Sequence, residues 1–167
     1  MYPEPPVRIV PAMPRDATLL LDMVRELAHF EQLSEAVCST AEDLRGALAS
    51  DPPQINALIA YYKEEPAGFA TWYWTFSTFK CRPGLYLEDL YVRGAYRRRG
   101  AGRAIMARLA RMAVDRGCDR MGWLVLDWNV NAQNFYARLG GTPNSPWFGY
   151  QMSETPLRAL AAKDTGG

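Results

Sequence analysis

Residues 84–128 limit the possible folds of this chain more than any other segment. The run GLYLEDLYV, residues 84–92, is rich in aliphatic and aromatic residues and predicts a strand. From Gly100 to about Arg116 apolar residues recur at helical intervals, and Gly117 is a natural end for that helix. The run MGWLVLDW then predicts another strand. A strand–helix–strand unit forms a right-handed crossover, so we expect an α/β protein.

The segments before this unit predict helices and an antiparallel meander. VRIVPA is a candidate first strand, and apolar spacing predicts a helix from about Pro14 to His29. Thr40 and Asp43 resemble a capping box, which opens a short helix through about Ala49. NALIAYY and FATWYWTFSTF, joined by the turn KEEPAG, predict an antiparallel hairpin.

The carboxyl-terminal part predicts one more helix and one more strand. NAQNFYARLG is a short amphipathic helix that ends at Gly140 and Gly141, and WFGYQMS predicts a last strand. The tail ALAAKDTGG is expected to fray. A chain of 167 residues is long enough for one hydrophobic core and too short for two ordinary ones. We expect one domain over residues 1–167, with flexible tails at 1–6 and about 156–167.

Composition and charge limit the classes of function. Hydrophobic residues make up 49% of the chain and charged residues 22%, which is typical of a globular protein and not of a disordered one. The 19 lysines and arginines nearly cancel the 18 acidic residues, leaving a net charge of +1. Nucleic-acid binding would therefore need a local basic patch.

The cysteines and the amino terminus bear on metal binding and location. Cys38, Cys81 and Cys118 are widely spaced and odd in number, and His29 is the only histidine. We therefore expect neither a disulfide framework nor a metal site. The amino terminus lacks a signal-peptide pattern, and no apolar run approaches the roughly 20 residues of a membrane span. A cytoplasmic protein without a membrane partner is expected.

The turn YRRRGAGR, residues 96–103, concentrates positive charge around two glycines where a helix is predicted to begin. A helix amino terminus presents unpaired N–H groups and a partial positive charge, which favour a phosphate and disfavour arginines unless an anion binds. The dinucleotide pattern GxGxxG fails at Ile105, and the chain has no GK[ST] sequence. From these residues alone, an exposed structural turn, a nucleic-acid contact and a phosphate cradle remain open.

The turn and its surroundings resemble a known family. The pattern Arg97-x-x-Gly100-x-Gly102, between a strand and a helix, is similar to the acetyl-CoA pyrophosphate motif of the GNAT superfamily of N-acetyltransferases. LYLEDLYVRGAYRRRGAGRAI, LVLDWNVNAQNFYARLG and ELAHFEQL look like its spermidine/spermine (diamine) and thialysine acetyltransferase branch. The likeness extends from about Val7 to Met152. It implies the GNAT fold, in which helices flank a mixed, mostly antiparallel sheet with a central strand splay, and it implies a homodimer.

The resemblance also implies a site for acetyl-CoA. In that fold the backbone of the strand before the turn hydrogen-bonds the pantetheine arm, and the N–H groups of residues 98–103 hold the pyrophosphate. The side chains of Arg98 and Arg99 either contact the 3′-phosphate of the coenzyme or face solvent. The implied coenzyme residues are Leu90, Tyr91, Val92, Arg97, Arg98, Arg99, Gly100, Ala101, Gly102, Arg103, Asn129 and Asn131.

Acetylation of an amine requires two proton transfers. An alkylamine with a pKa of roughly 10.4 is mostly protonated at neutral pH, so it must lose a proton before it attacks a thioester. Glu88 and Asp89 are adjacent in a predicted strand and are expected on opposite faces. The resemblance places both near the amine, with Glu88 as the first choice for binding the cation and relaying its proton. It assigns Tyr136 as the general acid that protonates the departing thiolate; otherwise Tyr136 is a half-buried helix residue.

The resemblance further places Phe30 and Glu31 beside the substrate, where a phenyl face and a carboxylate suit an extended cationic chain. The expected reaction is direct acetyl transfer from acetyl-CoA to a primary amine of a small molecule, either a diamine or polyamine or a lysine-like amino acid such as thialysine. The alternatives are a protein amine or an aminoglycoside-like amine as acceptor, a coenzyme-binding protein without catalysis, and a nucleic-acid binder in which Tyr91 and Tyr96 stack on bases. We expect no nucleic-acid partner.

Overall fold

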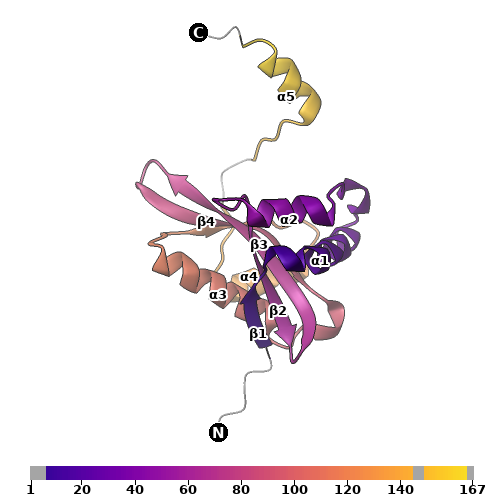
Figure 1. The fold of residues 1–167 in the computed structure, drawn as a ribbon. Coiled ribbons are helices and arrows are strands. Elements are labelled where there is room, and N and C mark those ends of the chain that lie inside the picture. Colours follow the sequence, from indigo (N-terminus) through magenta and orange to yellow (C-terminus); the bar gives the residue numbers. More distant parts are fainter. Residues whose placement is uncertain (1–6, 145–148, 165–167) are drawn as a thin grey trace. The chain divides into compact units, whose positions relative to one another are not determined.

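One five-stranded sheet organises the fold (Figure 1). The structure, a computed structural model, describes residues 7–144 and 149–164. The strands stand in the order β1-β2-β3-β4-β5; neighbours among the first four are antiparallel, and β5 is parallel to β4. The strands are β1 (Val7–Pro11), β2 (Asn56–Tyr62), β3 (Glu65–Ser77), β4 (Arg82–Val92) and β5 (Met121–Gly122).

The chain divides into two compact units, the first reaching to Leu124 and the second beginning at Val125. The first unit holds the whole sheet.

None of the helices in the described ranges has the length and apolar character needed to cross a membrane. The helices of the first unit are α1 (Ala17–Phe30), α2 (Ala41–Ala49), α3 (Ala101–Asp115) and the 3₁₀ turns η1 (Pro14–Asp16), η2 (Ser34–Ala36) and η3 (Gly94–Tyr96). Those of the second are α4 (Val130–Arg138) and α5 (Glu154–Ala161).

The central strands β2 and β3 are buried on both faces, with α1 and α3 on opposite sides of the sheet (Figure 1). Leu20 and Met23 of α1 pack against Ile59 of β2 and Phe69 of β3. Because successive strand residues face opposite sides, the buried neighbours of Ile59 and Phe69 point toward α3, whose Ile105 is fully buried. The strands that carry the candidate site are therefore held from both sides.

The helices begin and end close to where local sequence predicts. The helix predicted from Pro14 starts as η1 and continues as α1. Thr40 and Asp43 form the predicted capping box of α2, since Asp43 N–H donates to Thr40 Oγ1 (3.2 Å) and Thr40 N–H donates to Asp43 Oδ2 (2.8 Å). Left-handed glycines follow α3 and α4, namely Gly117 (φ 77°) and Gly140 (φ 91°). These predictions are confirmed.

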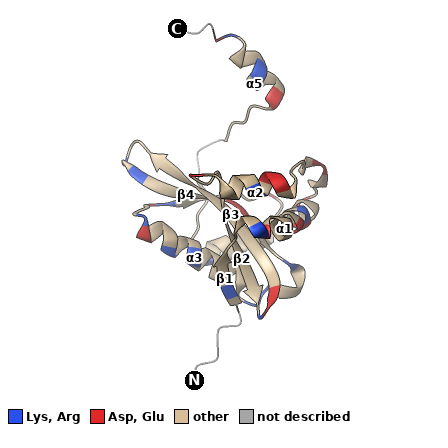
Figure 2. Ribbon diagram, in the orientation of Figure 1, with Lys and Arg blue, Asp and Glu red and all other residues tan. Residues whose placement is uncertain are grey.

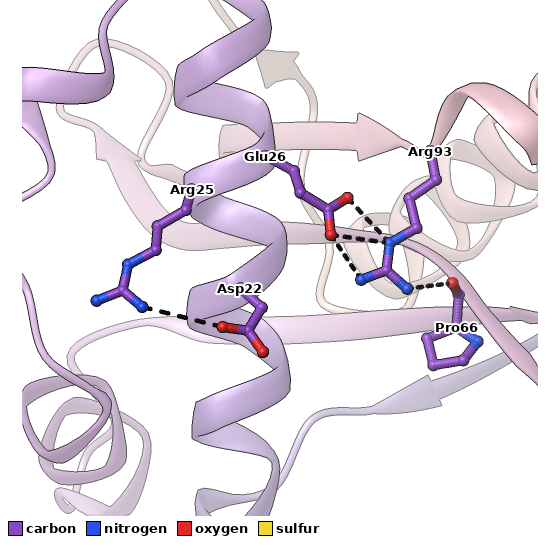
Figure 3. A network of polar contacts seen from close by, with 5 residues as sticks. All are labelled: Asp22, Arg25, Glu26, Pro66 and Arg93. Atoms are coloured by element: carbon purple, nitrogen blue, oxygen red, sulfur yellow. Dashed lines mark hydrogen bonds and ion pairs between the residues drawn. The ribbon is translucent and has the colours of Figure 1, made fainter.

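An ion pair fixes the carboxyl end of β4 against α1 (Figure 3). Arg93, the residue after β4, donates through Nε and Nη2 to the carboxylate of Glu26, at 2.9 and 2.7 Å. Its Nη1 donates to the carbonyl oxygen of Pro66 at 2.9 Å. A planar guanidinium that makes paired bonds to a carboxylate restricts geometry more than a lysine can. Arg93 therefore holds α1, the start of β3 and the end of β4 together, directly before the glycine turn.

The strand predicted over residues 121–128 is correct only at its beginning. β5 is limited to Met121 and Gly122, which pair with β4, and residues 123–128 are not in a strand. The apolar run has strand propensity, but a strand also needs a neighbour that satisfies its peptide groups. Leu124 is 84% exposed, which shows that this part of the run is not packed as a core strand.

The carboxyl-terminal predictions also differ from the structure. Of the predicted strand WFGYQMS, the first two residues lie outside the described ranges, and residues 149–153 form no strand. The tail that we expected to fray, from about residue 156, overlaps the later part of α5. Within α5, Arg158 Nε pairs with Glu154 Oε1 at 2.7 Å, one helical turn away. This pair and the alanine and leucine residues favour a helix locally, which the tail prediction did not weigh.

Gly68 of β3 provides a test of the close approach between β3 and β4. A Cβ atom at this position would overlap the backbone carbonyl oxygen of Tyr91, whereas a Cβ on Gly46 of α2 would meet nothing within 4 Å. Gly68→Ala should lower the free energy of unfolding by about 1–3 kcal/mol. Gly46→Ala should raise it by about 0.5–1 kcal/mol because alanine favours the helix. Urea unfolding measures both, and a Gly68→Ala protein as stable as the wild type would contradict the described packing.

Candidate active site

The strand β4 is paired along the whole of one edge and open along most of the other. β3 accompanies it from Arg82 to Val92, whereas β5 pairs only with Leu85 and Tyr86. In the described part of the chain, no strand pairs with this second edge beyond Tyr86. The splay predicted for the central strand corresponds to this open edge.

Peptide groups of β4 face the open edge at alternate residues. The N–H of Arg93 donates to the carbonyl oxygen of Ala67 in β3 at 2.9 Å. Since peptide groups alternate along a strand, those of Leu90 and Val92 face the open edge, and those of Tyr91 face β3. Among the residues predicted to bond the pantetheine arm, Leu90 and Val92 therefore have backbone groups available at this edge, whereas Tyr91 does not.

The glycine turn presents an array of N–H groups at the start of α3. Arg98 (φ 62°) and Gly100 (φ 91°) both adopt the left-handed conformation. The N–H groups of residues 98–103 donate to no backbone carbonyl in the described ranges, and the first helical bond runs from Ala104 N–H to Gly100 O at 2.9 Å. Consecutive unpaired N–H groups at a helix amino terminus fit a phosphate or pyrophosphate.

The arginine side chains of the turn differ in their surroundings. Arg99 lies over the ring of Tyr62, with its guanidinium carbon 5.1 Å from the ring centre. Its Nη1 is 3.4 Å from the Tyr62 hydroxyl oxygen. Arg98 and Arg103 are exposed. Basic residues also recur along α3 (Figure 2), so the positive charge of the turn continues into the helix, as suits an anionic ligand.

Phe30 is the last residue of α1, and its ring contacts Arg97 of the glycine turn. The guanidinium carbon of Arg97 lies 4.6 Å from the centre of the Phe30 ring. The phenyl face that we expected to lie along a cationic substrate therefore already carries a cation of the protein itself. Phe30 is 37% exposed, and Glu31 follows it directly.

A bulge in β4 lies at Glu88. Thr71 of β3 stands opposite Asp89 and Trp72 stands opposite Leu87, so Glu88 has no partner in the register. An extra residue of this kind bends a strand and redirects its side chains. The strict alternation that predicts opposite faces for Glu88 and Asp89 is therefore interrupted at the site itself.

The carboxylates of Glu31, Glu88 and Asp89 form an acidic cluster. Thr71 Oγ1 donates to Asp89 Oδ2 at 2.7 Å. Burial raises the pKa of Asp89 above its ordinary value, and the Thr71 hydrogen bond offsets part of that rise. Partial burial, and then the charge of Asp89, raise the pKa of both Glu31 and Glu88. A positive charge close to such a cluster favours the ionised carboxylates, and a protonated amine carries such a charge.

Two tyrosines border Glu88. The ring centres of Tyr73 and Tyr86 lie 5.1 Å apart. Burial, together with the nearby charge of Glu88, raises the pKa of each phenol. The sequence analysis did not identify Tyr86 or Thr71 as residues near the site. Tyr86 could have been predicted from the sequence, because it lies two residues before Glu88 in the same strand. Thr71 could not, because its place opposite Asp89 depends on the register of β3 and β4.

The second unit holds the other predicted site residues. Asn129 Oδ1 accepts a hydrogen bond from Ala132 N–H at 3.1 Å and so caps α4. Asn131 is exposed on that helix, and Tyr136 is half-buried there. The ring of Tyr136 meets that of Phe135 edge-on, with centres 5.1 Å apart. The roles of these residues in catalysis and coenzyme binding stay predictions.

Comparison with known proteins identifies the family. Residues 21–141 match the model of the Acetyltransferase (GNAT) family. This chain belongs to that family. It is similar to the thialysine N-epsilon-acetyltransferase of Caenorhabditis elegans, with 36% identity over 156 residues that cover 92% of this chain and 96% of the relative. The L-ornithine N5-acetyltransferase NATA1 of Arabidopsis thaliana is 36% identical over 109 residues, which are 65% of this chain and 45% of the relative.

The GNAT fold is also shared with solved structures. An integron cassette protein from the mobile metagenome of V. cholerae superposes with a TM-score of 0.78 at 24% identity, covering 93% of this chain and 98% of the other. The predicted GNAT fold and the predicted class of enzyme, an N-acetyltransferase, are confirmed. Enzymes of the GNAT family take the acetyl group from acetyl-CoA.

The raised pKa of Asp89 predicts how this GNAT protein responds to pH. A carboxyl group whose pKa is raised by folding is most favourable to the fold at low pH, and its contribution is lost as pH rises through the raised value. Asp89→Asn removes that cost and keeps a side-chain oxygen for Thr71. We expect a larger free energy of unfolding than the wild type at pH 7, with the difference disappearing below about pH 4.

Urea unfolding across this pH range measures the effect. Asp22→Asn, at an exposed position of α1, is the matched control and should change stability by less than about 0.5 kcal/mol. An Asp89→Asn protein that is less stable than the wild type at pH 7 would contradict the raised pKa of Asp89.

Proposed function

We propose that this protein transfers the acetyl group of acetyl-CoA to a primary amine of a small molecule, a diamine or polyamine or a lysine-like amino acid such as thialysine. The observation that carries the proposal is the acidic cluster of Glu31, Glu88 and Asp89, placed in and beside the strand whose next residues form the open edge. The relatives support it, because thialysine and ornithine each carry a side-chain primary amine.

The coenzyme would lie along the open edge and the glycine turn. The peptide groups of Leu90 and Val92 would bond the amides of the pantetheine arm as a neighbouring strand would. The N–H groups of residues 98–103 would hold the pyrophosphate. We further propose coenzyme contacts for Asn129 and Asn131, and contact of Arg99 with the coenzyme phosphates from its place on Tyr62. When bound, acetyl-CoA supplies an activated acyl group in the form of a thioester.

The acidic cluster would bind the ammonium form of the acceptor and then take its proton. Glu88 is exposed, and its raised pKa brings the carboxylate closer to the range of an effective base. Asp89 is more deeply placed and fixed by Thr71, so it would position the cation and leave proton transfer to Glu88. The proton leaves the amine for Glu88 and passes to water, while the freed nitrogen forms the new bond to the acetyl carbon.

Tyr136 would complete the reaction as the general acid. When the bond from carbon to sulfur breaks, the sulfur leaves as a thiolate and needs a proton. The hydroxyl group of Tyr136 would donate this proton to the sulfur. The acetyl group thus passes directly to the amine within a ternary complex, and no acetylated residue of the protein is formed.

A panel of amines tests the function directly. Purified protein is mixed with acetyl-CoA and with thialysine, lysine, ornithine, spermidine or an aminoglycoside, while thiol release is followed and the product identified by mass spectrometry. We expect acetylation of thialysine or another small diamine. Tyr136→Phe should lower kcat by about 10²–10⁴-fold, and Glu88→Gln should lower kcat and raise KM for the amine.

Matched controls come from exposed positions of the same chain. Tyr150, which is 97% exposed, and Glu35, which is exposed in η2, should tolerate Tyr150→Phe and Glu35→Gln without loss of turnover. Absence of thiol release with every amine in the panel would overturn the proposed function. Full activity of Tyr136→Phe would overturn the role of Tyr136 as the acid.

A further inference from the structure

The side chain of Arg97 contacts two separate parts of the proposed site. Its Nε donates to the carbonyl oxygen of Val92 at 2.9 Å. Its guanidinium carbon lies 4.6 Å from the ring centre of Phe30 and 5.9 Å from that of Tyr91. One planar group therefore bridges the end of β4 and the end of α1.

The groups that Arg97 contacts lie in two different parts of the proposed site, Val92 where the coenzyme would bind and Phe30 beside the acidic cluster. Val92 has its carbonyl on the open edge proposed for the pantetheine arm, and the turn proposed for the pyrophosphate starts one residue after Arg97. Phe30 is the last residue of α1, and Glu31 of the acidic cluster follows it. The N–H of Glu31 donates to the carbonyl oxygen of Leu27 at 2.9 Å, so its backbone continues the helix. Phe30 and Glu31 therefore share the same helical end of α1.

We propose that Arg97 couples the coenzyme turn to the amine site, so that bound coenzyme raises the affinity for the amine. This proposal rests on the proposed function. A pantetheine amide that bonds the Val92 carbonyl shares that acceptor with Arg97 Nε, and a pyrophosphate held by residues 98–103 fixes the turn that carries Arg97. Both contacts restrict the guanidinium, which in turn restricts Phe30 and Glu31. Arg97 is a positioning residue in this scheme.

Substitutions of Arg97 and Phe30 test whether the contact between the guanidinium and the ring, and not the positive charge alone, provides the coupling. Lysine keeps the positive charge but lacks the planar face and the Nε donor, so Arg97→Lys breaks the bridge. Phe30→Leu keeps an apolar side chain and removes the ring, which breaks the same bridge from the other end. Arg8, which lies 4.7 Å from the ring centre of Tyr61 in β2, supplies the control variant Arg8→Lys, a similar pair elsewhere on the sheet.

Calorimetry with and without coenzyme A measures the coupling. The probe is the best acceptor from the amine panel, and coenzyme A carries no acetyl group, so the ternary complex cannot react. We expect saturating coenzyme A to lower the dissociation constant of the amine about 5-fold or more in the wild type. The coupling ratio is the dissociation constant of the amine without coenzyme A divided by that with coenzyme A. This ratio should fall toward one in Arg97→Lys and in Phe30→Leu, and should stay at the wild-type value in Arg8→Lys.

The outcomes separate the inference from the function on which it rests. Urea unfolding of each variant confirms that it is folded at the temperature of the titration. An enzyme that acetylates its amine, but shows the same ratio in the wild type and in both bridge variants, overturns the coupling and leaves the function intact. A wild type that acetylates no amine in the panel overturns the function, and the coupling with it.

Discussion

The unequal pairing of the two edges of β4 is the constraint on which the rest of the site depends. β3 satisfies one edge along its whole length, and β5 leaves the other after Tyr86. A strand held on one side by a core helix and a neighbouring strand keeps its shape even though its second edge is open. Arg93, bonded to Glu26 and Pro66, fixes the end of that strand. Two peptide groups are therefore available to a ligand without loss of the fold.

The bulge at Glu88 adds the chemistry to this geometry. It lies within the acidic cluster, on the part of β4 that β5 leaves unpaired. Burial raises the pKa of Asp89, and burial followed by the charge of Asp89 raises the pKa of Glu31 and Glu88. Such a cluster destabilises the folded protein at neutral pH and is relieved when a cationic amine binds. In the proposed function, this loss of stability accompanies the binding of a cationic amine and supplies a carboxylate that accepts its proton. Thr71 limits the loss by holding one of the three carboxylates with a hydrogen bond.

Local patterns in the sequence predicted the parts of the structure that depend on neighbouring residues. The capping box at Thr40, the glycine turn at the start of α3 and the glycine that ends α3 each follow from short-range rules. The contacts that depend on register did not follow. The bulge at Glu88, the bond from Thr71 and the contact of Arg97 with Phe30 join segments far apart in the sequence. Strand propensity also extended the last predicted strands too far, because propensity does not supply a neighbouring strand.

Amide hydrogen exchange of β4, measured by NMR with and without acetyl-CoA, tests most directly the claim that the open edge receives the coenzyme. The account predicts that the N–H groups of Leu90 and Val92 exchange rapidly in the free protein and slow markedly when acetyl-CoA binds. The N–H of Tyr91, which faces β3, should exchange slowly in both states. Exchange at Leu90 and Val92 that is unchanged by bound acetyl-CoA would contradict the account.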